Sequence, residues 1–161
     1  MANERAPQQA LFGAGCFWGV EQAFMDTPGV IATQVGYCGG NLDRPTYDDV
    51  CSGTSGHTEV VLVQFDPAKI SYQALLERFF AIHDPTQLNR QGPDIGHQYR
   101  SVIHFFDAEQ EHAAREVRTA LSASGKHSHP IVTAIESAPA FWPAEEYHQK
   151  YHQKHGGGCH I

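Results

Sequence analysis

Strand-like and helix-like segments follow one another in a definite order along this chain of 161 residues, and that order limits the folds it can adopt. Runs of apolar and β-branched residues mark the strands, and apolar residues at helical spacing mark the helices. The predicted strands cover 8–13, 30–37, 58–66, 99–106 and 130–137, and the predicted helices cover 16–26, 71–83, 108–123 and 143–154. The first six segments run βαββαβ, a split-βαβ or ferredoxin-like order. We therefore predict an α/β (α+β) two-layer sandwich with a mixed sheet of about five strands and extra C-terminal helices.

Two long polar loops, 38–57 and 84–98, interrupt these elements. Loops of this length inside a compact domain usually carry a function. The chain shows no internal repeat and no low-complexity linker, so we expect a single domain over 1–161. The segment 155–161 contains a run of three glycines, and we expect it to form a flexible tail.

The composition excludes several classes of protein. The formal net charge is −7 and no basic stripe is present, so nucleic acid is not an expected partner. No apolar run reaches the roughly 18 residues of a membrane span, and residues 1–7 lack the apolar centre of a signal peptide. We expect a cytoplasmic monomer whose thiols are reduced and which has no contact with membranes.

Cys16 lies between the first predicted strand and the first predicted helix, in the sequence Gly15-Cys16-Phe17-Trp18-Gly19. A helix N-terminus presents unpaired N–H groups and the positive end of the helix dipole, and both favour an anion. A thiol at that place is biased towards the nucleophilic thiolate. A lone cysteine near a helix start is more often a small buried hydrophobe, but the flanking glycines permit close approach of the backbone. Cys16 is therefore the candidate nucleophile.

Glu59 shares one face of the predicted strand 58–66 with Val61, Val63 and Phe65. A carboxyl group on an apolar face has a raised pKa and can donate a proton near neutral pH. The other interpretation is a carboxylate at the strand edge, in contact with water. The pattern alone leaves both open.

Three further candidates lie in or beside the polar loops: Tyr47 in the first, and Asp94 and Tyr99 at the second. A loop tyrosine is more often a surface anchor than a functional group. An aspartate that follows a proline, as Asp94 follows Pro93, is more often a turn residue. Both interpretations stay open for these residues.

The chain contains 11 histidines, several of them near the C-terminus. His148 and His152 are four residues apart on the predicted helix 143–154, a spacing that can ligate one metal ion. No glutamate follows His148 as it does in a His-Glu-x-x-His zinc motif. We expect structural or surface histidines and no native metal site.

Several blocks of the sequence together resemble one family, peptide methionine sulfoxide reductase A. The blocks run in the family's order from about residue 10 to residue 152, and their joint occurrence by chance is negligible. They are Gly15–Gly19, Gly36–Gly40, Val50–Gly53, Gly56–Val61, His83–Thr86, Asp94–Ser101 and Glu146–Gln149. The resemblance implies an oxidoreductase that reduces the S epimer of methionine sulfoxide, free or in proteins, and so repairs oxidised proteins.

The resemblance also implies a role for each candidate. Cys16 would attack the sulfoxide sulfur as a thiolate, and a protonated Glu59 would donate to the sulfoxide oxygen. Tyr47 and Tyr99 would hydrogen-bond that oxygen, and Asp94 would help to order the site.

Phe17 and Trp18 would hold the S-methyl group of the substrate in an apolar pocket. The opposite epimer would place its oxygen against the aromatic rings and leave the donors unpaired. This pocket would therefore select one epimer.

A second thiol must condense with the sulfenic acid that the reaction leaves on Cys16. Cys159 is the candidate resolving cysteine, because it follows the glycine run that could swing a tail thiol over the site. Thioredoxin, by family resemblance, or a dithiol such as dithiothreitol would then reduce the Cys16–Cys159 disulfide. The resemblance implies no bound organic cofactor and no metal.

The other two cysteines and one threonine need separate comment. Cys38 stands where the family more often has a small residue; we expect an inert buried thiol, and the alternative is a second resolving cysteine. Cys51 fits the family pattern without being essential, and Thr58 replaces a commoner alanine, which should be tolerated.

Other functions remain open at this point. A thiol peroxidase or redox sensor could use Cys16 and would have no need of Glu59 or the tyrosines. A metal-binding protein could use the histidine-rich C-terminal region. A redox-regulated module could bind oxidised proteins without repairing them.

Overall fold

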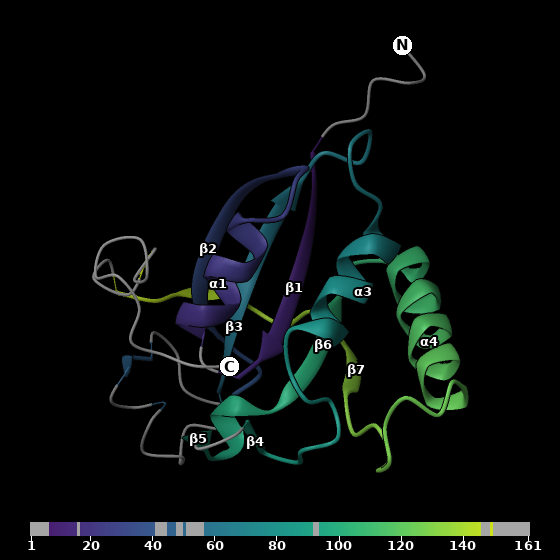
Figure 1. The fold of residues 1–161 in the computed structure, drawn as a ribbon. Helices are drawn as coiled ribbons and strands as arrows, with labels where there is room; N and C mark the ends of the chain where they lie inside the picture. Colours follow the sequence, from purple (N-terminus) through teal and green to yellow (C-terminus); the bar gives the residue numbers. More distant parts are fainter. Residues whose placement is uncertain are drawn as a thin grey trace.

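The structure, a computed structural model, describes residues 7–15, 17–40, 45–47, 50, 57–91, 94–145 and 149. Figure 1 shows the elements in these ranges. In chain order they are β1 (Gln8–Ala14), α1 (Phe17–Met25), β2 (Val30–Cys38), β3 (Thr58–Phe65), α3 (Tyr72–Ala81), β4 (Arg90–Gln91), β5 (Asp94–Ile95), the 3₁₀ turn η1 (His97–Tyr99), β6 (Ser101–Phe105), α4 (Ala108–Ala123), β7 (Ala134–Ser137) and β8 (Trp142–Pro143).

A mixed sheet of six strands, in the order β7-β6-β1-β3-β2-β8, organises the molecule. Strand β3 lies antiparallel between β1 and β2, which is the split-βαβ arrangement. Strand β6 pairs antiparallel with β1, and β7 pairs parallel with β6 after the crossover through α4. The predicted βαββαβ core is confirmed, with one more strand in the sheet than the five expected.

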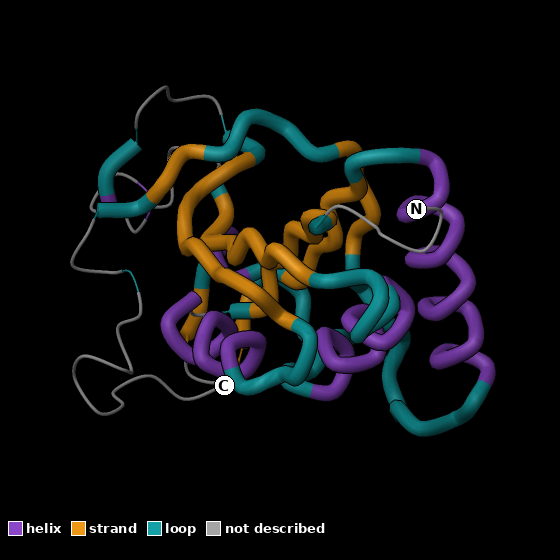
Figure 2. Tube along the Cα trace, turned by 90° about the horizontal axis from the view of Figure 1, so that it is seen from above, coloured by secondary structure: helices purple, strands orange, loops and turns teal. Residues whose placement is uncertain are grey.

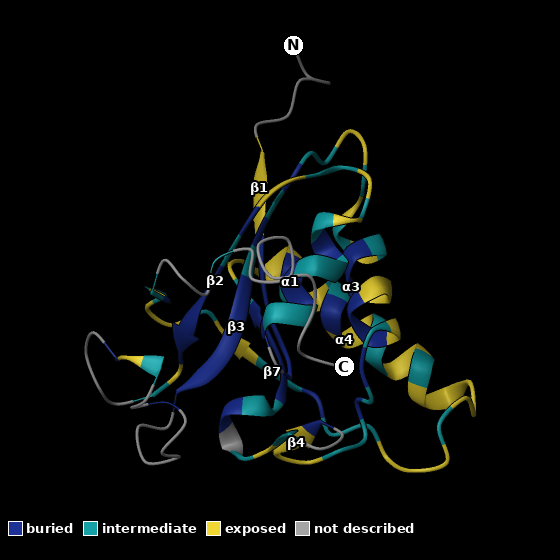
Figure 3. Ribbon diagram, turned by 60° about the vertical axis from the view of Figure 1, so that its left-hand side comes forward, coloured by how far each residue is buried: buried dark blue, intermediate teal, exposed yellow. Residues whose placement is uncertain are grey.

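The sheet separates two apolar layers, because successive side chains of a strand point to opposite faces. On one face Phe12 and Val63 pack in the main core with residues of α1 and α3, such as Phe24 and Phe79. Figure 2 shows helices gathered along one side of the strands, and Figure 1 shows α3 beside α4. The other face carries a small cluster of Leu11, Cys38 and Val60, against which Leu62, Ala138 and Phe141 pack. Figure 3 shows the central strands buried and the outer side of α4 exposed.

Local signals in the sequence account for the helix starts. The Ser71 hydroxyl accepts a hydrogen bond from the Ala74 N–H at 3.0 Å and caps α3. The Asp107 carboxylate accepts one from the Gln110 N–H at 2.8 Å and caps α4. The sequence predicts this cap, because Asp107 directly precedes the predicted helix 108–123 and Gln110 follows three residues later. The Gln110 amide reaches back to the N–H of Phe106 at 3.0 Å, one residue before the cap, and so fixes the approach of the chain to the helix.

The predicted helix 143–154 is wrong at its beginning. Trp142 and Pro143 form strand β8 and pair with Tyr37 and Gly36 of β2. Proline lacks an N–H and disfavours a helical residue before it, and it is tolerated in an edge strand. The remainder of that prediction, at 146–148 and 150–154, lies outside the described residues, as does the predicted tail 155–161.

The second polar loop is partly ordered by pairing of its own. Strands β4 and β5 form a two-stranded hairpin, and η1 follows, so β6 begins at Ser101 instead of residue 99. Strand β7 begins at Ala134 because the chain before it binds elsewhere: the Val132 N–H donates to the Pro85 carbonyl at 2.8 Å. Among the described residues, no helix is long and apolar enough to cross a membrane.

Replacement of the α4 cap by Asp107→Ala should lower the free energy of unfolding by about 1 kcal/mol, because the Gln110 N–H loses its acceptor. Asp107→Asn keeps an acceptor oxygen and is the matched control. Urea unfolding of the two variants measures the difference. Equal stability of the alanine and asparagine variants would contradict the capping role.

Candidate active site

Strand β1 passes into helix α1 through a turn that only glycine tolerates well. Gly15 has φ +103°, and a β-carbon placed there would lie 3.0 Å from the Cβ and Cγ atoms of Gln91. Helix α1 begins at Phe17, so the predicted change from strand to helix around Cys16 is confirmed. The side chain and backbone of Cys16 itself lie outside the described residues.

Gln91 supports this turn, and no motif in the sequence marks it for that position. The residue is buried, and its amide accepts from the Asp84 N–H at 2.9 Å and donates to the Asp84 carbonyl. The loop that begins at Asp84 is therefore tied to the residue that packs against Gly15.

Glu59 lies in the core, directly behind the start of α1. Its side chain is on the helix-covered face of β3, where Val61, Val63 and Phe65 join the main core, and only 1% of the residue is exposed. Its Oε1 accepts a hydrogen bond from the Phe17 N–H at 3.1 Å. That N–H is the first of the helix and has no acceptor within it. Of the two interpretations left open by the sequence, the structure shows the buried one.

Burial raises the pKa of the Glu59 carboxyl to about 8. Loss of hydration is the largest cause, the Phe17 N–H opposes it, and the charge of Asp94 adds to it. The second oxygen, Oε2, has no hydrogen-bond partner among the described residues. A carboxyl group with this pKa is protonated at neutral pH.

Asp94 and Tyr99 come from the hairpin and turn that follow β4. Asp94 is half-buried in β5, burial raises its pKa, and its charge is felt at Glu59. Tyr99 ends η1, which packs against β3, the strand that carries Glu59. The structure therefore brings these segments to the same end of β3, from far along the chain.

Aromatic rings gather around the start of α1. The ring of Tyr47 stacks on Trp18, with centroids 6.0 Å apart and planes 20° apart, and on Phe17 at 6.3 Å. The buried Tyr37 ring lies 5.7 Å from Phe17. Tyr47 and Trp18 remain half-exposed. Such a group of rings offers an apolar, polarisable contact for a small alkyl or thioether group.

Two residues of the C-terminal segment, Glu145 and Gln149, reach into this region. The Glu145 carboxylate accepts from the Tyr37 hydroxyl at 2.9 Å and from the Tyr47 N–H at 3.0 Å. The Gln149 amide binds the N–H and carbonyl of Val35 and the carbonyl of Ala144, at 2.9 to 3.0 Å. No pattern in the sequence singles out Glu145, so its position could not be predicted.

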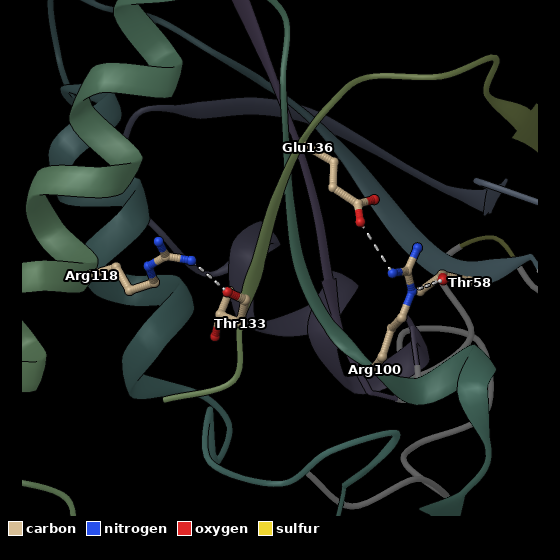
Figure 4. A network of polar contacts seen from close by, with 5 residues as sticks. All are labelled: Thr58, Arg100, Arg118, Thr133 and Glu136. Atoms are coloured by element: carbon tan, nitrogen blue, oxygen red, sulfur yellow. Dashed lines mark hydrogen bonds and ion pairs between the residues drawn. The ribbon is translucent and has the colours of Figure 1, made fainter. Parts of the chain in front are cut away.

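A polar network on the opposite face of the sheet fixes the start of β3. The Arg100 guanidinium donates to the Thr58 hydroxyl at 2.8 Å and forms an ion pair with Glu136 at 3.5 Å (Figure 4). Figure 4 also shows a separate contact, in which Arg118 of α4 donates a hydrogen bond to the Thr133 carbonyl at 3.0 Å. Thr58 therefore accepts a hydrogen bond that an alanine at this position could not accept.

The structure describes some of the remaining cysteines and histidines and not others. Cys38 is fully buried on the face opposite Glu59, and burial raises the pKa of its thiol to about 12, which fits the expected inert thiol. Cys51 and Cys159 lie outside the described residues, as do His148 and His152. Within the described ranges, no group of three or more possible ligands could hold a metal ion.

We expect Gly15→Ala to destabilise the fold by about 1–3 kcal/mol, because alanine disfavours a positive φ and its β-carbon would crowd Gln91. Gly125→Ala is the matched control: Gly125 also has positive φ, but nothing lies within 4 Å of a β-carbon there. Urea unfolding compares the two. A loss no larger for Gly15→Ala than for Gly125→Ala would contradict the importance of the Gln91 contact.

The raised pKa of Glu59 should make stability depend on pH. Below the ordinary pKa of 4.5 the group is protonated in both folded and unfolded chains. As pH rises from 4.5 to about 8 only the unfolded chain ionises, so the free energy of unfolding falls by up to about 1.4 kcal/mol per pH unit. Glu59→Gln should remove this fall, as measured by urea unfolding at pH 5 and pH 8.

Glu77→Gln, on the exposed side of α3, is the control for that experiment and should keep the pH dependence of the parent chain. An unchanged pH dependence in Glu59→Gln would show that the Glu59 carboxyl is ionised in the folded protein at neutral pH.

Comparison with known proteins places this geometry in a family. The family model described as peptide methionine sulfoxide reductase matches residues 8–161. The chain is 58% identical over 158 residues to peptide methionine sulfoxide reductase MsrA of Methanoculleus marisnigri, covering 98% of this chain and 96% of that one. It is 60% identical over 151 residues to MsrA of Geobacter metallireducens, covering 94% and 93%.

Solved structures agree. The reduced form of Mxr1 from Saccharomyces cerevisiae has a TM-score of 0.89 at 31% identity, over 96% of this chain and 91% of that one. Methionine sulfoxide reductase A of Corynebacterium diphtheriae has a TM-score of 0.86 at 36% identity, over 99% and 80%. Mxr1 in complex with Trx2, at 20% identity and a TM-score of 0.65, shares the fold. The resemblance inferred from the sequence blocks is thus confirmed, and the chain belongs to the peptide methionine sulfoxide reductase family.

Proposed function

We propose that this chain reduces the S epimer of methionine sulfoxide to methionine, with Cys16 as the nucleophile and Glu59 as the proton donor. The observation that carries the proposal is the buried Glu59 carboxyl, bonded to the first N–H of the helix that begins directly after Cys16. Membership of an oxidoreductase family whose relatives carry this activity in their names supports it.

In the first step the Cys16 thiolate attacks the sulfoxide sulfur, and Glu59 gives its proton to the sulfoxide oxygen. The oxygen leaves on the cysteine as sulfenic acid, and methionine is released. The sulfoxide sulfur is reduced by two electrons and the Cys16 sulfur is oxidised by two. A carboxyl whose pKa is raised to about 8 is still protonated at pH 7, as this step requires.

The rings of Phe17, Trp18 and Tyr47 would receive the S-methyl group. The hydroxyls of Tyr47 and Tyr99 would bind the oxygen on the Glu59 side, and Asp94 would help to order the site. Only one configuration at the sulfur would place the methyl group against the rings and the oxygen on the Glu59 side. The other epimer would press its oxygen against the rings.

In the second step the Cys159 thiol attacks the sulfenic acid of Cys16, which forms the disulfide and releases water. A dithiol then reduces that disulfide by exchange. Cys38 suits this role poorly, because its thiol is buried on the other face of the sheet with a pKa of about 12. Thioredoxin is the proposed reductant, since the yeast relative Mxr1 has been solved in complex with Trx2.

The family match favours this reductase over the thiol peroxidase and the metal-binding protein that the sequence left open. The reaction as proposed uses only thiols, a carboxyl group and phenols of the chain. A single domain over 1–161, a monomeric state, a cytoplasmic location and the absence of a bound cofactor remain predictions.

A single turnover without reductant tests the proposal. The reduced chain, mixed with a peptide that contains the S epimer of methionine sulfoxide, should give about one methionine per chain and a Cys16–Cys159 disulfide in the mass spectrum. Cys16→Ser should give none. Cys159→Ser should give about one methionine per chain but should not sustain repeated turnover with thioredoxin. Cys38→Ser should behave as the parent chain.

The R epimer is the control for stereochemistry and should give no methionine. Methionine from Cys16→Ser would refute the nucleophile. Sustained turnover of Cys159→Ser with thioredoxin would move the resolving role to another cysteine, and no methionine from the parent chain would refute the reductase.

A further inference from the structure

Glu145 makes a bridge that the proposed reaction does not account for. Its Oε1 accepts from the Tyr37 hydroxyl at 2.9 Å, and its Oε2 accepts from the Tyr47 N–H at 3.0 Å. Tyr37 belongs to β2, Tyr47 lies within the first polar loop, and Glu145 follows β8. One carboxylate therefore joins two parts of the chain that precede it by 108 and 98 residues.

The bridge bears directly on the aromatic group at the start of α1. Tyr47 stacks on Trp18 at 6.0 Å and on Phe17 at 6.3 Å, and Tyr37 contacts Phe17 at 5.7 Å. Tyr47 is only half-buried, so packing alone restrains it weakly. A hydrogen bond from its backbone to a carboxylate is stronger than one to a neutral acceptor and holds this segment in one arrangement.

We infer that Glu145 is a positioning residue that holds Tyr47 against Trp18, and so sets the affinity and alignment of the sulfoxide. The inference rests on the proposed function, in which Tyr47 contacts the substrate. Glu145 acts through Tyr47 and does not touch the reacting atoms.

Three substitutions of Glu145 differ in which of its two hydrogen bonds they can keep. Leucine removes both acceptors. Glutamine can keep both bonds, since its carbonyl oxygen accepts from the Tyr47 N–H and its amide donates to the Tyr37 hydroxyl oxygen. Aspartate is one methylene shorter and cannot reach both donors at their present distances.

A second residue of the same segment gives a matched control. Gln149 binds Val35 and Ala144 through three hydrogen bonds and so holds the C-terminal segment to β2. Gln149→Leu loosens that attachment without removing an acceptor from Tyr47. If Glu145 merely fastened the segment, the two leucine variants would behave alike.

The experiment is a double-mutant cycle of Glu145→Leu and Tyr47→Ala on sulfoxide reduction with dithiothreitol. Glu145→Leu alone should raise KM for an S-sulfoxide peptide about 10-fold or more, with a smaller change in kcat. In the Tyr47→Ala background it should add less than about 2-fold, because the residue through which it acts is gone. Glu145→Gln should stay within about 3-fold of the parent chain.

Two readouts separate positioning from general damage. The rate at which iodoacetamide alkylates Cys16 should not change in Glu145→Leu, since the turn at Gly15 is untouched. The near-ultraviolet circular dichroism of the Trp18–Tyr47 stack should weaken in Glu145→Leu and persist in Glu145→Gln.

Additive losses in the cycle, or the same KM change in Gln149→Leu, would overturn the inference while leaving the reductase intact. If Glu145→Leu does not fold, Glu145→Asp replaces it in the cycle with the same criteria. A parent chain that reduces no sulfoxide would instead overturn the proposed function.

Discussion

The hydrogen bond between the Glu59 carboxyl and the Phe17 N–H joins the sheet to the first turn of α1, and the site depends on it. An N–H at a helix start has no acceptor within the helix, and a carboxyl buried in an apolar core requires a partner or a proton. The hydrogen bond gives the N–H an acceptor, but one donor satisfies the buried carboxyl group only in part. The single N–H does not offset the loss of hydration, so the pKa of Glu59 rises to about 8 and the group keeps its proton.

The contacts around this bond come from segments that meet only in the fold. Gln91 packs under Gly15 while its amide holds the backbone of Asp84. The charge of Asp94 reaches Glu59 from the small hairpin. Glu145 joins Tyr37 and Tyr47, whose rings contact Phe17 and Trp18. A carboxyl acid, an apolar group of rings and a helix start are thereby assembled at one end of the central strands, and the proposed reaction needs an acid on one side of the sulfoxide and an alkyl contact on the other.

The two faces of the sheet have different functions. The helix-covered face carries Glu59, and the opposite face buries Cys38 beside Leu11 and Val60. Cys38 is the partner of Thr58 in the ladder between β2 and β3, one position from the pair formed by Tyr37 and Glu59. A shift of one residue changes the face of the sheet, and this alternation separates the buried Cys38 thiol from Glu59.

The sequence by itself determined the βαββαβ order, the Asp107 cap, the helix start after Cys16 and the family, because these depend on periodicity and on residues close together in the chain. It also placed Glu59 on an apolar face, but it left open whether water reached the carboxyl. Only the tertiary structure decided that, since burial of Glu59 depends on α1 packing over β3. The same holds for Gln91 and Glu145, whose partners are set by long-range contacts, and for β8, which forms because β2 offers it an edge. Local pattern fixes which face a side chain occupies, and only the packing of distant segments fixes what that face meets.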